Sequence, residues 1–290
     1  MRKVAINGND FQDERLRDIG AFLVSLHGVG LKVYVAADFA RYLQSGGLDL
    51  TGMEAVEEVP EDVSVVASIG GDGTFLRTAA WVGRRQTPII GVNTGHLGYL
   101  AGFSMDRHGE VMAALYGDGD LTPRMTLEIE SPFLPDDYSR FALNEVSVSK
   151  GDTLTMVTVN AYLDGRYLAT YQGDGLVVAT PTGSTAYNLS CGGPVIEPTL
   201  ECFVLSPIAP HSLTLRPLVV GAASELRLEV SSRGSKCHVG IDGRTFSVPA
   251  SGSEIIVRRA DHMVNVVQPK GVDFSEVLRE KLRWGEMPLR

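Results

Sequence analysis

The sequence contains only three cysteines, and it lacks both a long hydrophobic run and an excess of positive charge. Cys191, Cys202 and Cys237 are odd in number and have no C-x-x-C spacing, which argues against a disulfide framework or a zinc site. No stretch approaches the roughly 18 unbroken apolar residues that a membrane helix needs. The first residues, MRKVAING, enter a strand pattern instead of a signal peptide.

Charge excludes further classes of partner. The formal net charge of -9 argues against a nucleic-acid surface or an anionic membrane, because both require clustered lysine and arginine. A phosphorylated small molecule remains possible if local backbone N–H groups, a few arginines and a metal ion hold it. These absences predict a cytoplasmic protein with neither a nucleic-acid nor a membrane partner.

The hydrophobic pattern changes once along the 290 residues, which are enough for two domains. Short apolar strands alternate with helix-length segments at first, as in an open parallel sheet covered by helices. Later, period-two strands with turn residues between them are typical of a sandwich-like β domain. We expect an α/β domain over 1–121 and a β-rich domain over 122–268. The remainder, 269–290, contains helical spacing and can pack back on the first domain.

Two Asp-Gly dipeptides lie between alternating apolar residues, at Asp164-Gly165 and Asp242-Gly243. This pattern is typical of tight β-hairpins, because both central turn positions require positive φ. We therefore interpret both aspartates first as turn formers.

The stretch SIGGDGTF, residues 68–75, places three glycines around Asp72 directly after an apolar run that predicts a buried strand. A helix over TFLRTAAWV is expected to follow, with Thr74 near its cap. Open α/β sheets bind ligands at the carboxyl ends of their strands, and glycines there let backbone N–H groups approach an anion. The stretch is not a P-loop, and it lacks the third glycine of G-x-G-x-x-G, where Leu76 stands instead.

Two interpretations of Asp72 follow. Two like charges about 4 Å apart cost on the order of 4 kcal/mol at an effective dielectric constant of 20. Asp72 would therefore repel a bare polyphosphate, but beside phosphates screened by Mg²⁺ it can accept a proton from an attacking hydroxyl. Alternatively, the bend is only a tight turn in which Asp72 caps the helix.

Three further stretches combine turn residues with polar side chains. The glycines of PIIGVNTGHLGYLAGF (88–103) fit either a close approach to a ligand or an ordinary turn. In GDGLVVATPTGSTAYNLSCGGP (173–194) a buried strand leads into a turn with several hydroxyls and an aromatic ring, which suits adenine, although helix capping alone also explains it. Ser184 is a weak candidate nucleophile, because the chain has no G-x-S-x-G. Asn144-Glu145 interrupts an apolar alternation, so the pair either faces solvent or lines a site.

The motifs GGDGT (70–74), NTGHLGYL (93–100), NE (144–145) and DGLVVATPTGSTAYNLSCGGP (174–194) together resemble those of the NAD kinase family. The resemblance runs in the same order over most of the chain and includes SPIAPHSLTLRPLVV at 206–220. A lone GGDGT also occurs in phosphofructokinases and lipid kinases, whereas the full set is specific.

The resemblance implies a Rossmann-like amino-terminal domain, a β-rich carboxyl-terminal domain and a site in the cleft between them. It implies transfer of the γ-phosphoryl group of ATP to the 2'-hydroxyl of the adenosine ribose of NAD, with Mg²⁺ or another divalent cation. It also implies a homodimer or homotetramer.

Site residues follow from the same resemblance, with Asp72 as the proton acceptor and no residue assigned to a metal. Asp174 is expected near the nucleotide pocket, which lies partly across a subunit interface. Ala209 is a weaker member of the site, and so is Arg244, which stands where many members have glutamine. The expected NAD-binding residues are Asp72, Gly73, Arg77, Asn144, Glu145, Asp174, Thr182, Thr185, Ala186, Tyr187, Asn188 and Ser190.

Two other functions remain as alternatives. A lipid kinase of the diacylglycerol type shares the glycine-aspartate bend but should show a basic or apolar membrane-facing patch, which this acidic chain does not display. A non-catalytic NAD-binding regulator would not need an intact Asp72.

Overall fold

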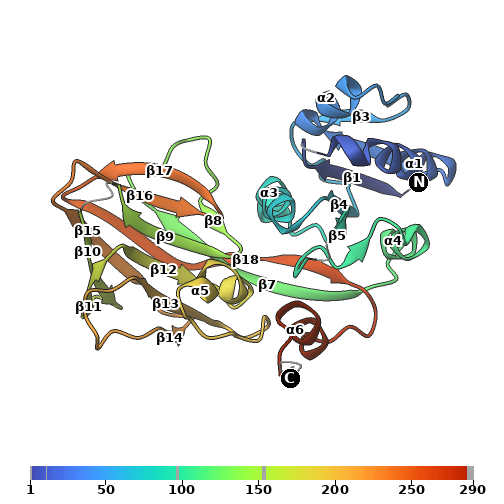
Figure 1. Ribbon diagram of the computed structural model, residues 1–290. Coiled ribbons are helices and arrows are strands. Elements are labelled where there is room, and N and C mark those ends of the chain that lie inside the picture. The colour runs from blue at the N-terminus through green and yellow to red at the C-terminus, as the bar shows by residue number, and fades with distance from the viewer. Residues whose placement is uncertain (1, 11, 96–97, 152–154, 286–290) are drawn as a thin grey trace. The chain divides into compact units, whose positions relative to one another are not determined.

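The chain divides into two compact units. Unit 1 combines Met1–Pro123 with Val264–Arg290, and unit 2 is Arg124–Met263 (Figure 1). Two strands, β7 (Asp120–Glu130) and β18 (Ser253–Gln268), contribute residues to both units. The computed structural model of the protein describes residues 2–10, 12–95, 98–151 and 155–285.

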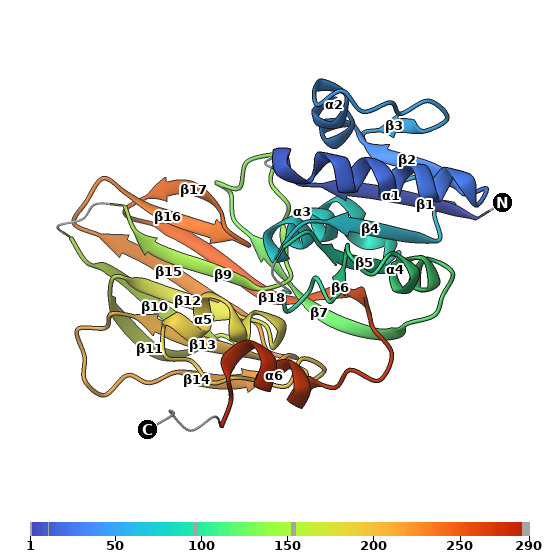
Figure 2. The same ribbon diagram turned by 45° about the vertical axis from the view of Figure 1, so that its right-hand side comes forward.

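Unit 1 alternates strands and helices before β7 and ends with one helix after β18. The sheet order is β3-β2-β1-β4-β5, with the end of β18 beside β5, and these neighbours are parallel (Figure 2). Chain order reverses between β1 and β4, as in Rossmann-like sheets. The elements are β1 (Lys3–Gly8), α1 (Leu16–Gly28), β2 (Lys32–Ala36), α2 (Ala37–Ser45), β3 (Glu54–Val56), β4 (Val65–Ile69), α3 (Asp72–Val82), β5 (Ile89–Asn93), β6 (Phe103–Ser104), α4 (His108–Leu115) and α6 (Phe274–Leu282), with short 3-10 turns at Asp13–Arg15 and Gly83–Arg85.

Helices cover both faces of this sheet. Apolar residues of α1, α2 and α4 share one buried cluster with alternate residues of the central strands. Helix α3 lies on the other face, because its Thr78 hydrogen bonds Ser68 and Asn7, which alternate along their strands with residues of that cluster. Helix α3 begins at Asp72, two residues before the expected start at Thr74, and Gly71 occupies its N-cap.

Unit 2 is almost entirely strands. One sheet has the order β11-β10-β15-β18, with β7 and then β8 following β18, and the other has the order β14-β13-β12-β9-β16-β17. The elements not yet given are β8 (Phe141–Ala142), β9 (Glu145–Lys150), β10 (Val157–Leu163), β11 (Arg166–Gly173), β12 (Gly175–Ala179), α5 (Tyr187–Ser190), β13 (Cys202–Ile208), β14 (Leu218–Gly221), β15 (Leu226–Ser232), β16 (Lys236–Ile241) and β17 (Arg244–Pro249), with a 3-10 turn at Thr182–Thr185.

The core of unit 2 forms where alternate residues of the two sheets meet. Leu127 and Val159 come from one sheet, Val178 and Phe203 come from the other, and all four belong to one buried cluster. The expected pairing of an α/β domain with a sandwich-like β domain is therefore confirmed. Within the described ranges, no helix has both the length and the apolar character needed to span a membrane.

Both predicted hairpins are present. Strands β10 and β11 meet at Asp164-Gly165, and β16 and β17 meet at Asp242-Gly243. All four turn residues have positive φ, which is the conformation that Asp-Gly favours.

Candidate functional site

In unit 1, the predicted residues Asp72, Gly73 and Arg77 lie beside the reversal of strand order. Asp72 and Gly73 open α3 just after the carboxyl end of β4. The exposed Arg77 donates to Asn9 Oδ1 at 3.1 Å, and the Asn9 N–H donates to the Ile69 carbonyl at 3.2 Å. Asn9 directly follows β1. Open α/β sheets bind ligands at such a reversal, so these three residues lie at the edge where a ligand of this type of sheet is expected.

The Asp72 carboxylate accepts three consecutive backbone N–H groups. Tyr99 N donates to Oδ2 at 2.8 Å, and Leu100 N and Ala101 N donate to Oδ1 at 2.9 and 3.1 Å. The described hydrogen bonds of this carboxylate all run to that loop and none to α3, so Asp72 does not act as a helix cap. An ionised carboxylate has about four acceptor positions. Among the described residues, one position on Oδ2 therefore remains for another donor.

Neighbouring residues fix the loop against Asp72. Buried Asn93 donates its amide to the carbonyls of Ala101 at 3.3 Å and Phe103 at 2.7 Å. An added Cβ on Gly98 would collide with the Asp72 carboxylate, so only glycine fits there without displacing it. The close approach of the loop to Asp72 therefore explains why residue 98 is a glycine. His96, in the same motif, lies outside the described residues.

In unit 2, the NE pair and the 182–190 turn come together at one end of β12. Thr180 N donates to the Asn144 carbonyl at 2.8 Å, and Gly183 packs directly on the Asn144 backbone. Three side-chain atoms there are buried without a hydrogen-bond partner among the described residues: Asn144 Oδ1, Glu145 Oε2 and Thr182 Oγ1. Buried polar atoms are normally paired with protein, water or ligand, so this group is suited to receive a polar ligand.

Glu145 has an unusual environment. Burial raises the pKa of its carboxyl to about 8, the negative charge of Asp242 adds to this, and the Tyr187 backbone N–H acts in the opposite direction. Without a ligand, Glu145 is therefore mostly protonated at neutral pH and can donate as well as accept. The Tyr187 side chain is 43% exposed, which leaves its ring face available for stacking.

The remaining residues of this turn are divided between surface and interior. Thr185 and Ala186 are half-buried, Ser190 is exposed and Asn188 is fully buried. The Asn188 amide donates to the carbonyls of Ser184 at 2.9 Å and Pro194 at 3.2 Å and accepts from Ser206 Oγ at 2.6 Å. Asn188 thus holds the turn against β13 and the following loop.

Ser184 is also fully buried. Its hydroxyl accepts from Ile196 N at 3.0 Å and lies 3.3 Å from the Ile196 carbonyl. This arrangement gives Ser184 a scaffolding role and no access to a substrate.

Asp174 and Ala209 lie at the opposite end of β12. Strand register pairs Ala179 with Glu145, whereas Asp174 precedes the first residue of the strand. Asp174 forms an ion pair with Lys150 at 2.7 Å, and its N–H donates to the Ile208 carbonyl at 2.9 Å. Five residues of strand separate the two ends by about 17 Å. Within one chain, Asp174 therefore lies along β12 from the NE pair, although its charge still acts on the Tyr187 side chain. Its expected place near the nucleotide pocket stays a prediction.

Arg244 faces a different part of unit 2. Its guanidinium donates to the Asp137 carbonyl and carboxylate at 3.1 Å each and stacks 4.0 Å from the centre of the Tyr138 ring. These contacts connect the β16–β17 hairpin to the 131–140 loop. Arg244 thus makes local contacts that glutamine could not reproduce.

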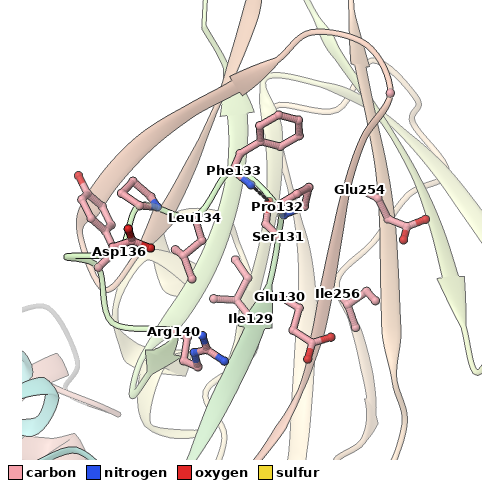
Figure 3. A pocket seen from close by; sticks show the side chains of 13 residues that line it. Ile129, Glu130, Ser131, Pro132, Phe133, Leu134, Asp136, Arg140, Glu254 and Ile256 are labelled. Carbon is pink, nitrogen blue, oxygen red and sulfur yellow. Dashed lines mark hydrogen bonds between the residues drawn. The ribbon is translucent and has the colours of Figure 1, made fainter.

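The same loop covers a cavity of about 500 Å³, into which side chains from the loop, β7 and β18 project (Figure 3). None of the predicted site residues lines it. The lining residues are Ile129, Glu130, Ser131, Pro132, Phe133, Leu134, Pro135, Asp136, Tyr138, Arg140, Gly252, Glu254 and Ile256.

Sequence reasoning missed two charged residues that lie near the predicted ones. Lys281 of α6 interacts electrostatically with Asp72; burial lowers the pKa of Lys281, and the charge of Asp72 opposes this. Asp242 contacts the backbone of the NE pair. Helical spacing and a hairpin pattern were the only features that the sequence offered at these positions.

Comparison with known proteins identifies the family. The model of the ATP-NAD kinase N-terminal domain matches residues 23–120, and that of the ATP-NAD kinase C-terminal domain matches 143–269. An NAD kinase of Porphyromonas gingivalis is 42% identical over 289 residues, covering 98% of this chain and 99% of the relative. This chain belongs to the NAD kinase family. An NAD kinase of Geobacter metallireducens is 36% identical, covering 99% of this chain and 100% of the relative.

Solved structures of NAD kinases and their relatives share the fold. The crystal structure of yeast NADH kinase complexed with NADH has a TM-score of 0.86 at 25% identity, covering 100% of this chain and 89% of that one. An Archaeoglobus fulgidus NAD kinase in complex with ATP has a TM-score of 0.71 at 27% identity, covering 93% of this chain and 94% of that one. The predicted family and fold class are confirmed.

Gly98→Ala should destabilise unit 1, because the new methyl group displaces the Asp72 carboxylate from its three N–H donors. We expect a loss of about 1 to 3 kcal/mol in the free energy of unfolding, measured in urea. Gly95→Ala is the matched control in the same loop, since its methyl group would meet no described atom within 4 Å. Equal stability of the two variants would contradict the contact.

Glu145→Gln should change how the stability of the ligand-free protein depends on pH. Because folding raises the pKa of Glu145 from 4.5 to about 8, the folded state binds an extra proton between these values. The associated stability is complete below pH 4.5 and is lost as pH rises through about 8. From pH 5 to pH 8 the variant should gain more than about 1 kcal/mol relative to the wild type. Urea unfolding at both values measures this, with exposed Glu61→Gln as the control; identical pH dependence in all three proteins would refute it.

Proposed function

We propose that this protein transfers the γ-phosphoryl group of ATP to the 2'-hydroxyl of the adenosine ribose of NAD and so produces NADP. Family membership supports this activity. The structural observation that carries the proposal is the group of buried, unpartnered oxygens of Asn144, Glu145 and Thr182 beside the exposed Tyr187 ring. The amino group of adenine and the ribose hydroxyls supply donors for these oxygens, and a purine can stack on the ring.

Asp72 is the proposed proton acceptor. Phosphoryl transfer passes through a loose transition state, so the protein contributes mainly alignment and charge stabilisation. Three N–H bonds hold the Asp72 carboxylate still, and the remaining acceptor position on Oδ2 can orient the ribose hydroxyl and take its proton. Gly73 and Arg77, at the same sheet edge, suit contact with phosphate through a backbone N–H and a cation.

A divalent cation such as Mg²⁺ belongs to this proposal as part of the ATP complex. Mg²⁺ keeps several waters and binds substrate phosphates with one or two carboxylates, so it needs no cage of protein ligands. When bound, it would neutralise the phosphates and so remove the repulsion from Asp72. The Asp72 carboxylate fits one ligand position of such an ion, and the nearby cations Arg77 and Lys281 suit the phosphates that the ion would accompany.

A second copy of the chain is the proposed source of part of the site. Asp174 and Ala209 lie about 17 Å along β12 from the NE pair, farther than one adenosine group spans. Ala209 has a φ of 41°, a strained conformation for a residue other than glycine, and such strain is concentrated at functional positions. We infer that these residues contact NAD held by a partner subunit, in a homodimer or homotetramer.

The alternatives predict different behaviour. A lipid kinase would bind vesicles, and a non-catalytic regulator would bind NAD without turnover. The acidic net charge of -9 favours a small-molecule enzyme in the cytoplasm over one acting on membranes or nucleic acid. The deciding assay incubates purified protein with NAD, ATP and Mg²⁺ and measures NADP.

Asp72→Asn should lower kcat by at least about 10²-fold, because a general base contributes about 10² to 10⁴-fold. NAD affinity, measured by calorimetry, should change little, since the NE pair and the 182–190 turn are intact. Near-normal turnover would remove Asp72 from the role of base.

Mixing two inactive variants tests the shared site. Asp72→Asn and Asp174→Asn each lack one of the two carboxylates. If each site takes Asp72 from one subunit and Asp174 from the other, a mixed dimer contains one site with both native aspartates. Unfolding and reassembling a 1:1 mixture should restore about a quarter of wild-type turnover. Absence of any recovery, with mixed dimers verified by mass spectrometry, would place both aspartates in a site formed by one chain.

A further inference from the structure

The two Asp-Gly hairpin turns have the same backbone conformation. Asp164 and Asp242 have φ of 51° and 46°, and Gly165 and Gly243 have φ of 75° and 85°. Asparagine tolerates such left-handed positions as well as aspartate does. The turn itself therefore requires a carboxylate at neither position.

The Asp242 carboxylate makes contacts that the turn does not need. Leu143 N donates to its Oδ2 at 2.7 Å, and Asn144 N and Glu145 N donate to its Oδ1 at 2.8 and 3.1 Å. In return, Asp242 N donates to the Glu145 carbonyl at 3.1 Å. Four hydrogen bonds thus connect this turn to the segment that contains the NE pair.

The opposite side of the 143–145 segment contacts Thr180, which lies between β12 and the 182–190 turn. The Leu143 carbonyl accepts from Thr180 Oγ1 at 2.6 Å, and the Asn144 carbonyl accepts from Thr180 N at 2.8 Å. Gly183 packs on the Asn144 backbone, where a larger residue has no room. With the N–H groups bound by Asp242 and the carbonyls of Leu143 and Asn144 bound by Thr180, the peptide planes of this segment are held in one orientation, which restricts where the Asn144 and Glu145 side chains point.

Asp164 provides the contrast. Its carboxylate accepts from Ser224 Oγ at 3.0 Å and Glu225 N at 2.9 Å. Neither partner belongs to the predicted site. The chain therefore contains two equivalent turns, of which only one is connected to site residues.

We propose that Asp242 is a positioning residue for NAD, whose carboxylate holds 143–145 so that Asn144 and Glu145 face the dinucleotide. This inference rests on the proposed function and deepens it. An asparagine at this position has one acceptor oxygen, and its amide N–H groups would face backbone donors, so the segment loses hydrogen bonds. The loss weakens NAD binding and leaves the phosphoryl transfer step at Asp72 unchanged.

The test compares Asp242→Asn with Asp164→Asn in steady-state assays of NADP formation. Asp242→Asn should raise KM for NAD by about 10-fold or more, with kcat within about 3-fold and KM for ATP unchanged. Asp164→Asn should leave all three constants as in the wild type. Partial unfolding lowers apparent kcat without moving KM, so a raised KM for NAD alone separates positioning from instability. Equal KM for NAD in the two variants overturns the inference.

A double substitution tests whether Asp242 acts through the NE pair. In an Asn144→Ala background, Asp242→Asn should raise KM for NAD by less than about 3-fold, because coupled residues are not additive. Full additivity overturns the inference. If Asp242→Asn does not fold, Asp242→Glu, which moves both acceptor oxygens outward by one methylene, replaces it: a raised KM for NAD supports the inference and an unchanged one overturns it.

Failure of the proposed function can be distinguished from failure of the inference about Asp242. If the wild-type protein forms no NADP, the proposed function is contradicted. The inference is then tested by calorimetry with NAD on the same two variants, where weaker binding by Asp242→Asn than by Asp164→Asn supports it and equal binding overturns it.

Discussion

One interaction recurs in both units: an aspartate carboxylate that accepts three consecutive backbone N–H groups of a loop. Asp72 holds 99–101 in unit 1, and Asp242 holds 143–145 in unit 2. In each case two donors share Oδ1 and one donates to Oδ2. Backbone N–H groups that are left unpaired in a folded protein are costly, and an ionised acceptor bonds them more strongly than a neutral one. Each carboxylate therefore fixes a loop that irregular sequence alone would leave free to adopt several conformations.

The carboxylates of Asp72 and Asp242 differ in burial and in the charges around them. Burial raises the pKa of Asp242 to about 6, against the effect of its three N–H donors, and its charge in turn raises the pKa of the neighbouring Glu145. Asp72 is half-buried just after the carboxyl end of β4, with Arg77 five residues further along α3 and Lys281 within electrostatic range. The same hydrogen-bond arrangement thus holds the proposed proton acceptor in one unit and the proposed positioning residue in the other.

The sequence pattern predicted the strands and turns, which depend on interactions between residues that are close in the sequence. Short apolar strands between helix-length segments predicted the parallel sheet, and period-two alternation predicted the β-rich domain. Asp-Gly dipeptides predicted both hairpin turns, because the φ preference of these residues acts within the turn itself. The partners of Asp72 and Asp242 could not be predicted, since they lie 27 to 29 and 97 to 99 residues away in the sequence. Asn188 shows the same limit: its motif suggests a ligand contact, but packing against Ser206 of β13 buries its amide. Only the folded chain decides which polar residues of a motif face a ligand.

The return of β18 to β5 also bears on synthesis at the ribosome. Ile89 and Ile90 of β5 are both fully buried, and they pair with Val266 and Val267 of β18 along one edge of β5. These two valines are translated about 180 residues later. Until then the nascent parallel sheet exposes an unpaired apolar edge of the kind that recruits other strands. We therefore expect this edge to need protection from association with other strands until β18 has been synthesised and pairs with β5.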